Sequence, residues 1–372
     1  MQLHKAPLTR VQRQAYEAVR RACNAPLDTL QLREELAARV RPALPSDAGA
    51  LATSDPEVGL LSHALYWDYP AAALEHYLTD VYPREGAARI IDLGLSGMFA
   101  TTKTGPIEAD WIATHGLGSK LLVSFADRGM IWGAGCLVRD RESPPFSEED
   151  EAFFRLLAPE IAAGLRRAAL LEVARDADAG DVADDSLAPG VALYELRGRL
   201  VLRDARVTDY LTDLGDPPPE PNGTPVVPQV VAAALTHLQL RLRAGNAAPG
   251  SAGAAGIRAR GKSGRWYTVH ASAAEAVDAA QAGQALVVVA PMGGGERGSV
   301  LARLYGLTPR EREIIVRIAR GESGKQIAAA VGLSAHTVQA HINNACAKVG
   351  ARGRKELLAK LFFDGATARM AS

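Results

Sequence analysis

The chain has 372 residues, in which 42 basic and 42 acidic side chains balance to a formal net charge of zero. Apolar residues make up 48% of it, which excludes an intrinsically disordered chain and is enough to build hydrophobic cores. Its length exceeds that of one ordinary domain and predicts about two to four.

The N-terminus shows no signal-peptide pattern, because residues 1–7 lead into an amphipathic segment without an apolar core. Apolar stretches such as 285–292 are under half the roughly 20 residues that a membrane-spanning helix needs. Cys23, Cys136 and Cys346 lie in separate segments, and the histidines show no metal-site spacing. We therefore expect a cytoplasmic protein with reduced, structural thiols, no metal, no cofactor and no membrane contact.

Composition predicts three modules, at residues 8–174, 187–291 and 300–364. Two connectors separate them. Residues 175–190 are acidic and small and end in Pro-Gly, and residues 292–298 are rich in glycine. Such stretches are typical of exposed connectors.

The first module has an α/β pattern. The expected elements are helices at about 9–23 and 27–40 and strands at 49–53, 60–66, 120–126 and 129–138. Asp-Pro and Gly form the turn between the first two strands, and Asp127-Arg128 forms the turn between the last two. Apolar and glycine residues occupy both parities of the last strand, which predicts burial on both of its faces.

A long helix is expected from Ser147 to about residue 174. Ser147 is followed by three acidic residues, which suits a helix N-terminus. One apolar stripe follows at three- and four-residue spacing: Phe153, Leu157, Ile161, Leu165, Ala168 and Leu171. The stripe either packs on the module's own sheet or pairs with a second copy of the chain.

This order of helices, strand hairpins and a long exit helix after Pro-Phe-Ser-Glu-Glu-Asp resembles a GAF domain. GAF domains are sensory, so the resemblance implies a pocket on one sheet face beneath the helices. Trp111, His115, Trp132 and Cys136 are candidate lining residues, with core packing as the alternative for each. The fold alone identifies no ligand.

The middle module has an α+β pattern. The expected elements are strands at 190–196 and 199–203, a helix to about 214, a proline-rich stretch at 216–228, an amphipathic helix at 230–243, a flexible segment at 244–256, and strands at 257–260, 265–271 and 284–290. Two strands, helices and three further strands are similar to a PAS fold. Trp266 and His270 lie on one face of a strand and are candidates to border a ligand, with core or interface packing as the alternative.

The third module is predicted to be all-α with four helices. Thr308 and Glu311 form a capping box at the start of the first helix, which ends at Gly321. The second helix is short, at 324–331, and the fourth is expected at 354–363. A module of this size is marginal alone, so the last helix is expected to pack on the others.

The third helix begins after Ser334 and has two distinct faces. Its inner stripe is Val338, Ile342, Ala345, Cys346 and Val349. Its outer face carries His336, Ala340, Asn343, Asn344 and Ala347, with Thr337, Gln339, His341 and Lys348 on the rims. Small and amide-bearing side chains suit close approach to base edges, because Asn and Gln can bond an adenine through two hydrogen bonds.

The charge of this module supports the same interpretation. Residues 308–363 contain ten lysines and arginines against four glutamates, a net charge of +6 in a chain that is neutral as a whole. A local cationic surface is what phosphate binding requires.

Residues 307–363 resemble the LuxR/FixJ-type helix-turn-helix of bacterial transcription regulators. The matching positions are Leu307, Thr308, Arg310, Glu311, Glu313, Gly321, Lys325, Ile327, Ala328, Leu333, Ser334, Thr337, Val338, His341, Lys348, Gly350, Arg352, Arg354, Glu356 and Leu357. The resemblance implies that the third helix reads DNA through Gln339, Ala340 and Asn343. Gln339 stands where the family often has Lys or Arg, which favours adenine over guanine.

We therefore expect a sequence-specific DNA-binding transcription regulator that is controlled by its two upstream modules. The predicted DNA-binding residues are Lys325, His336, Thr337, Gln339, Ala340, His341, Asn343, Asn344, Lys348, Arg352 and Arg354. Double-stranded DNA and a second copy of the chain are the expected partners, and a small-molecule ligand and RNA polymerase are candidate partners. The alternative is an adaptor whose C-terminal bundle docks on another protein.

No enzymatic activity is expected. The sequence shows no nucleophile with a matching base, no phosphate-cradling loop after a strand and no metal-ligand spacing.

Overall fold

The computed structural model describes residues 8–179, 188–215, 227–244, 256–274, 283–292, 305–319 and 321–362. Contacts divide the chain into two compact units, Met1–Ala168 with Leu187–Pro291, and Ala169–Ser186 with Met292–Ser372. The two upstream modules thus share one unit, and the predicted limits of the three modules stay predictions. Within the described part of the chain, no helix combines the length and the apolar character needed to span a membrane.

A five-stranded antiparallel sheet forms the centre of the N-terminal part of the first unit. Its strands are β1 (Ala48–Ser54), β2 (Leu61–Trp67), β3 (Ala100–Thr101), β4 (Leu117–Asp127) and β5 (Met130–Asp140), in the order β2-β1-β5-β4-β3. The four predicted strands are confirmed, and β4 and β5 are longer than expected. β5 is buried on both faces, as predicted, and β4 is buried in the same way over residues 120–126.

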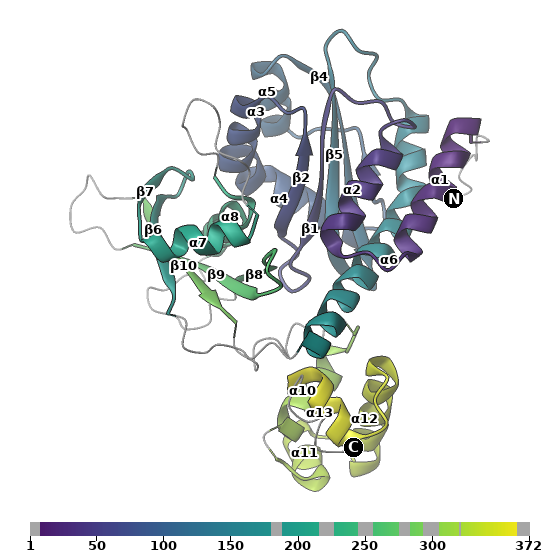
Figure 1. Ribbon diagram of the computed structural model, residues 1–372, viewed down its shortest axis with the longest axis vertical. Coiled ribbons are helices and arrows are strands. Elements are labelled where there is room, and N and C mark those ends of the chain that lie inside the picture. The colour runs from purple at the N-terminus through teal and green to yellow at the C-terminus, as the bar shows by residue number, and fades with distance from the viewer. Residues whose placement is uncertain are drawn as a thin grey trace. The chain divides into compact units, whose positions relative to one another are not determined.

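Helices cover both faces of this sheet (Figure 1). On one face lie α1 (Arg10–Asn24), α2 (Thr29–Val40) and α6 (Glu148–Ala179), and on the other α3 (Ala71–His76), η1 (Tyr77–Gly86), α4 (Ala87–Leu95) and α5 (Pro106–Thr114). α1, α2 and α6 confirm the predicted helices. No helix or strand was predicted for residues 67–119, because the helices there are short and η1 is a π-helix that contains Pro83.

α6 packs on its own domain. Ser147 caps it as predicted: its Oγ accepts a hydrogen bond from the Asp150 backbone N–H at 3.1 Å. Five of the six stripe residues are at most 2% exposed within the chain: Phe153, Leu157, Ile161, Leu165 and Ala168. Of the two alternatives for the stripe, packing within the domain therefore accounts for these five positions.

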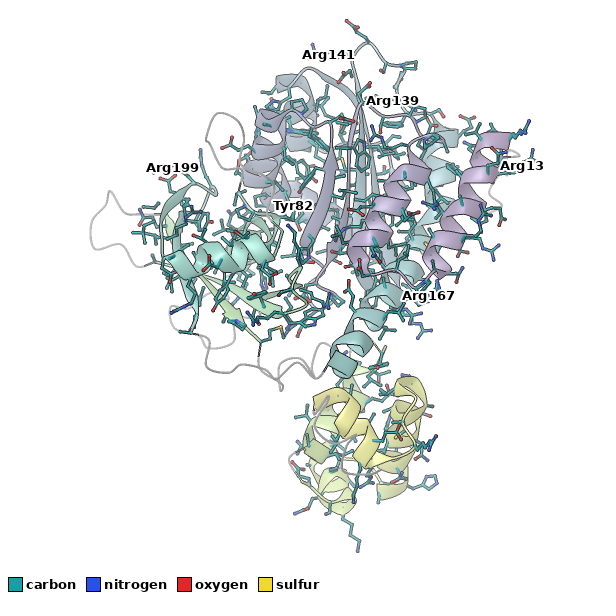
Figure 2. All side chains as sticks on the ribbon, viewed as in Figure 1. Arg13, Tyr82, Arg139, Arg141, Arg167 and Arg199 are labelled. Atoms are coloured by element: carbon teal, nitrogen blue, oxygen red, sulfur yellow. The ribbon has the colours of Figure 1, made fainter. Side chains whose placement is uncertain are left out.

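Two arginines that Figure 2 labels secure the ends of this layer. The Arg139 guanidinium lies 4.0 Å from the Phe146 ring centroid and 3.3 Å from Asp150, which joins the end of β5 to the start of α6. Arg167 Nε donates to the Cys23 carbonyl at 3.1 Å, which joins α6 to α1. α6 continues to Ala179, five residues into the predicted connector. The rest of that connector up to residue 187, and residues 293–298 of the other, lie outside the described residues.

A second five-stranded antiparallel sheet forms the middle module. Its strands are β6 (Gly190–Glu195), β7 (Leu200–Arg203), β8 (Ile257–Arg260), β9 (Trp266–Ala273) and β10 (Gln284–Pro291), in the order β7-β6-β10-β9-β8. Helices α7 (Ala205–Asp213) and α8 (Gln229–Arg243) connect the second strand to the third. The predicted element order is confirmed, and the two sheets share the same strand order. The similarity to a PAS fold stays a prediction. Residues 216–226 and 245–255, in the predicted proline-rich and flexible segments, lie outside the described residues.

α8 is the main difference from the prediction for this module. It was expected to be amphipathic, but residues 229–236 are all buried. α8 contacts β8 and β9 of its own sheet, and it also contacts β2 and η1 of the first sheet's domain. A helix with a neighbour on each side has no polar face, so the amphipathic prediction is wrong for this half of α8.

A buried carboxylate joins the two domains at another point. Asp55, in the β1–β2 turn, is 2% exposed. Its Oδ2 accepts a hydrogen bond from the Arg258 backbone N–H at 2.8 Å, and its Oδ1 accepts one from the Glu57 backbone N–H at 2.8 Å. The Arg258 side chain also pairs with Glu57. The β1–β2 turn is thereby bonded to β8 of the other sheet.

The C-terminal part of the second unit is a bundle of α10 (Pro309–Ala319), α11 (Gly324–Val331), α12 (Ala335–Val349) and α13 (Arg354–Phe362). The predicted capping box is present: the Thr308 N–H donates to Glu311 Oε2 at 2.7 Å, and the Glu311 N–H donates to Thr308 Oγ1 at 3.2 Å. Gly332 and Gly350 end α11 and α12 with φ of 65° and 68°, in the left-handed region that suits glycine.

The three cysteines are free and buried, as predicted for structural thiols. Burial raises the pKa of Cys23 to about 12 and also raises the pKa of Cys136 and of Cys346. The thiols are therefore protonated near neutral pH and poorly suited to redox chemistry.

Removing the Asp55 carboxylate leaves the N–H groups of Arg258 and Glu57 without an acceptor. We expect Asp55→Ala to lower the free energy of unfolding by roughly 2–4 kcal/mol, because each unsatisfied buried donor costs about 1–3 kcal/mol. Urea denaturation followed by tryptophan fluorescence measures this loss for the first unit alone, since all four tryptophans lie in it.

The control is Glu17→Ala, at a side chain that is 56% exposed, which should cost less than about 0.5 kcal/mol. Equal losses for the two variants would show that the Asp55 contacts do not hold the two domains together.

Candidate nucleic-acid interface

α12 presents the outer face that its sequence predicts. His336, Ala340, Asn343, Asn344 and Ala347 are all exposed, and the five residues of the inner stripe are all buried. On the rims, Gln339 and Lys348 are exposed, and Thr337 and His341 are half-buried. Ser334 caps the helix, with its Oγ accepting from the Thr337 N–H at 3.1 Å.

A chain of three side chains connects α13 to this face. Arg354 Nη2 donates to Gln339 Oε1 at 2.8 Å, and Gln339 Nε2 donates to Asn343 Oδ1 at 2.9 Å. We call these three residues the amide relay. It places the Arg354 cation beside Gln339. Gln339 is neutral, at a position where helix-turn-helix domains of this type often have Lys or Arg. Sequence analysis named all three residues and missed their connection.

Lys348 is engaged inside the bundle. Its Nζ lies 2.7 Å from Oε2 of Glu311, a residue that is only 3% exposed. Burial raises the pKa of the Glu311 carboxyl, but hydrogen bonds from Lys348 and Thr308 outweigh burial, so this pKa lies below its ordinary value. Lys348 therefore ties α12 to the start of α10, in addition to its place on the rim.

Other cations of the bundle also bond within it. Arg310 pairs with Glu313 at 2.6 Å, Arg317 pairs with Glu322 at 3.2 Å, and Arg312 donates to the Leu307 carbonyl at 3.0 Å. Exposed cations in the described part of the bundle include Lys325, Arg352 and Lys355. The net charge of +6 thus overstates the number of cations that are available to a phosphate backbone.

The first unit contains a small cavity beneath α3, η1 and α4. Its volume is about 30 Å³, roughly the space of two water molecules. Its walls are formed by Ala50, Ala52, Leu61, Ala64, Tyr66, Tyr69, Leu74, Tyr77, Ile90, Leu122, Ala134, Gly135, Cys136 and Gln229. The Tyr69 hydroxyl donates to Cys136 Sγ at 3.3 Å, and burial raises the pKa of Tyr69 well above its ordinary value. The cavity is apolar, with neutral phenol and thiol groups.

A residue of the middle module forms part of the wall of this cavity. Gln229, the first residue of α8, is 7% exposed, and its Oε1 accepts a hydrogen bond from the Tyr66 hydroxyl. Its Nε2 donates to the Leu61 carbonyl at 3.3 Å. Sequence analysis missed Gln229 as a site residue. The available signal was a lone amide directly after Pro228 at the start of an otherwise apolar helical segment.

A buried ion pair lies beside the cavity. Lys120 and Glu108 are 2% and 0% exposed and pair with each other, and Arg89 Nε lies 3.1 Å from the second oxygen of Glu108. Lys120 Nζ is 5.3 Å from the ring centroid of Tyr77, a wall residue. Lys120 lowers the pKa of Cys136, but burial raises it more, so the thiol stays neutral.

Of the four candidates for this pocket, only Cys136 lines the cavity. Trp111 is fully buried, and its indole N–H donates to the Ala73 carbonyl at 2.9 Å. His115 lies 3.0 Å from His76, and Trp132 donates to the Asp127 carbonyl at 3.3 Å in the β4–β5 hairpin. These contacts favour the core or local packing that was the alternative for each.

In the middle module, His270 lines a smaller cavity of about 10 Å³ together with His237 and Arg241. Trp266 does not line it and is half-buried. Among the side chains that the structure describes, no group of three His, Cys, Asp or Glu is placed to hold a metal ion.

Two parts of the chain match known families. Residues 306–361 match the family described as bacterial regulatory proteins, luxR family, and residues 28–165 match the GAF domain. The GAF resemblance and the helix-turn-helix resemblance are thereby confirmed, as is the multidomain fold class.

Two relatives from Bacillus subtilis match the C-terminal region. The chain is 41% identical over 54 residues to the uncharacterized transcriptional regulatory protein YhcZ, covering 14% of this chain and 25% of YhcZ. It is 38% identical over 59 residues to spore germination protein GerE, covering 16% of this chain and 80% of GerE. The chain thus spans most of GerE but only a quarter of YhcZ.

Among solved structures, the GAF domain from a phosphoenolpyruvate-protein phosphotransferase of Coxiella burnetii covers 44% of this chain and 98% of its own. The identity is 17% and the TM-score is 0.29, which is too low to support an argument.

Replacing Lys348 with methionine keeps the aliphatic stem and leaves the Glu311 carboxylate without its ammonium partner. We expect Lys348→Met to raise the pKa of Glu311 and to destabilise the bundle by about 1–2 kcal/mol, since a buried acceptor loses a charged donor. Because the native pKa is depressed, the stabilisation by Glu311 is present above its unfolded pKa and disappears as pH falls through the folded pKa. The pH-dependent loss should be smaller in the variant, because its folded pKa moves back toward or above the unfolded value.

Hydrogen exchange of α10 and α12 peptides between about pH 3 and about pH 6 measures both effects, because this range brackets the ordinary Glu pKa of about 4.3. The matched control is Lys325→Met, at an exposed lysine. Identical exchange in the two variants would mean that the Lys348 contact contributes nothing.

Proposed function

This chain belongs to the luxR family of bacterial regulatory proteins, which are DNA-binding transcription regulators, and we propose that α12 reads DNA in the major groove under the control of the first unit. The observation that carries this proposal is the exposed face of α12, which combines small and amide side chains with Lys348 on its rim and with Arg354 bonded to Gln339. Adaptor-type docking on a protein leaves that combination without an explanation. No enzymatic activity is proposed, since the matched family consists of regulatory proteins.

Each part of the face has a role in this proposal. Ala340 lets the helix approach the bases, and Gln339 and Asn343 bond to base edges. His336, His341 and Asn344 flank these positions. The start of α12 at Thr337, together with Lys325, Lys348 and Arg352, binds phosphates, which position the helix without reading sequence.

We propose that two copies bind together, since paired reader helices of this kind recognise half-sites about one helical turn apart. The stripe of α6 up to Ala168 and the residues Leu357 and Leu361 of α13 are already buried within the chain. They therefore contribute little to such a pair. RNA polymerase is the partner through which a bound regulator acts on transcription, and the cytoplasm is the compartment in which it meets DNA.

The first unit is proposed to sense a small ligand in the GAF cavity. The cavity is small and apolar and has Gln229 in its wall, so a ligand larger than a few atoms has to move wall residues such as this one. Gln229 begins α8, which packs against both sheets. A change in the cavity is thereby transmitted to the middle module, and from there to the connector that leads to the bundle.

Base reading and phosphate binding are separable by mutation. We expect Asn343→Ala to lower the preference for specific over random DNA, because it removes an amide from the reading face. Lys325→Ala should weaken binding to all sequences alike and reduce the slope of log K against log salt by about 1. Gel-shift titrations of the full chain with a selected site and with random DNA, at two salt concentrations, measure both.

Equal losses for selected and random DNA from Asn343→Ala would overturn the base-reading assignment. If the full chain shows no salt-dependent binding to any DNA, the bundle is a protein-docking module instead.

Gln229→Ala tests the control by the first unit. The variant removes the amide that bonds Tyr66 and Leu61, so we expect the DNA affinity of the full chain to change several-fold, a coupling of about 1 kcal/mol. Gln239→Ala is the matched control, because Gln239 lies on the same helix, donates to the Leu196 carbonyl at 2.7 Å and accepts from Arg243 at 3.4 Å, and both of these described partners belong to its own module. If both variants bind DNA as the wild type does, α8 does not couple the cavity to the bundle.

A further inference from the structure

The amide relay connects one arginine to two of the side chains that are assigned to base reading. We propose that Arg354 is a positioning residue, which sets the direction in which the amides of Gln339 and Asn343 point and thereby selects guanine over adenine. This inference rests on the proposed reading role of α12.

The chemistry of Arg354 determines the direction of both amides. A guanidinium has hydrogen-bond donors and no acceptor, so the Gln339 atom that faces it has to be the oxygen. The Gln339 nitrogen then faces Asn343, and the Asn343 atom that receives its hydrogen has to be the oxygen as well. The distances of 2.8 and 2.9 Å show that both bonds are formed. A single cation therefore orders two amides that would otherwise be free to flip.

The surroundings keep Arg354 available for this role. It is half-buried at the first position of α13, and Gly324 of α11 lies beside it: a Cβ on Gly324 would be 3.6 Å from Arg354 Nη2. Within the described part of the chain, no carboxylate forms an ion pair with Arg354, in contrast to Arg310 and Arg317. The guanidinium is thus directed to the amide and not to an acid.

The relay determines which groups remain for DNA. Both ends of the Gln339 amide are engaged, and the Asn343 oxygen already accepts one hydrogen bond, whereas both hydrogens of Asn343 Nδ2 are free of the relay. An adenine contact through two bonds needs an oxygen and a nitrogen of one amide side by side. A guanine offers two acceptors, N7 and O6, and either of them matches a free hydrogen of Asn343 Nδ2. The relay therefore shifts the preference from adenine toward guanine, because an amide oxygen that already accepts one hydrogen bond is a poorer acceptor for a second, whereas the Asn343 hydrogens remain unused.

The test compares base preferences of the full chain, selected from a random DNA library, for charge-matched variants. Arg354→Glu replaces a donor by an acceptor, which turns both amides around and presents the Asn343 oxygen to the groove. Lys355→Glu makes the same change of charge at the next residue, an exposed lysine outside the relay. We expect guanine at the Asn343 position for the wild type and for Lys355→Glu, and a shift of about tenfold toward adenine for Arg354→Glu. Both glutamate variants should bind more weakly overall.

Gln339→Ala provides a second route that changes no charge. It breaks the relay and frees the Asn343 oxygen, so it should also shift the base preference toward adenine. This variant therefore tests the role of the relay even if Arg354→Glu does not fold. Circular dichroism of each variant reports its folding.

The inference is overturned if Arg354→Glu and Lys355→Glu select the same base, if Gln339→Ala retains guanine, or if the wild type selects adenine. In these cases the chain still reads DNA. A wild-type chain that enriches no sequence at all would instead refute the proposed function.

Discussion

The position of α12 depends on the carboxylate of Glu311. This carboxylate completes the capping box of α10 with Thr308, and it accepts a hydrogen bond from the Lys348 ammonium on α12. It is almost fully buried. A buried carboxylate is tolerated only when donors surround it, so the start of α10 and the end of α12 have to meet at this point. The outer face of α12 is exposed because the opposite face is fixed: the inner stripe is buried and Lys348 is bonded to Glu311.

The distribution of charge in the bundle follows from the same pairing of donors with acceptors. Several of its arginines and lysines bond to glutamates or carbonyls within the bundle, which stabilises the short helices. Lys325, Arg352 and Lys355 remain exposed. A neutral Gln339 is compatible with this arrangement, because Arg354 delivers a positive charge to the same place from the next helix.

In the first unit, α8 has the corresponding role. Two sheets with the same strand order share this one helix, whose first two turns are buried between them. Asp55 and Gln229 supply the polar contacts that fix the relative position of the two domains. Gln229 also lines the GAF cavity. The sensory domain of this regulator therefore has one residue of its cavity wall in the middle module.

The sequence by itself determined the elements whose signals are local. Capping residues such as Thr308 and Ser147, the strand hairpins and the apolar stripe of α12 were all predicted, because each depends on neighbours within a few residues. The family motif around Thr337 and Val338 is equally local. The limits of the modules, the PAS similarity and the roles of individual site residues stay predictions.

Only the tertiary structure decided what depends on partners far along the chain. The burial of α8 on both sides and the place of Gln229 in the cavity wall have no periodic signal, because they depend on contacts such as Gln229 with Leu61 and Arg243 with Pro83, which are 160 or more positions apart. The amide relay joins side chains up to 15 positions apart on two helices. Residue type tells which hydrogen bonds a side chain is able to make, but the packing of the helices decides which partner it reaches, and so which groups are left to meet DNA.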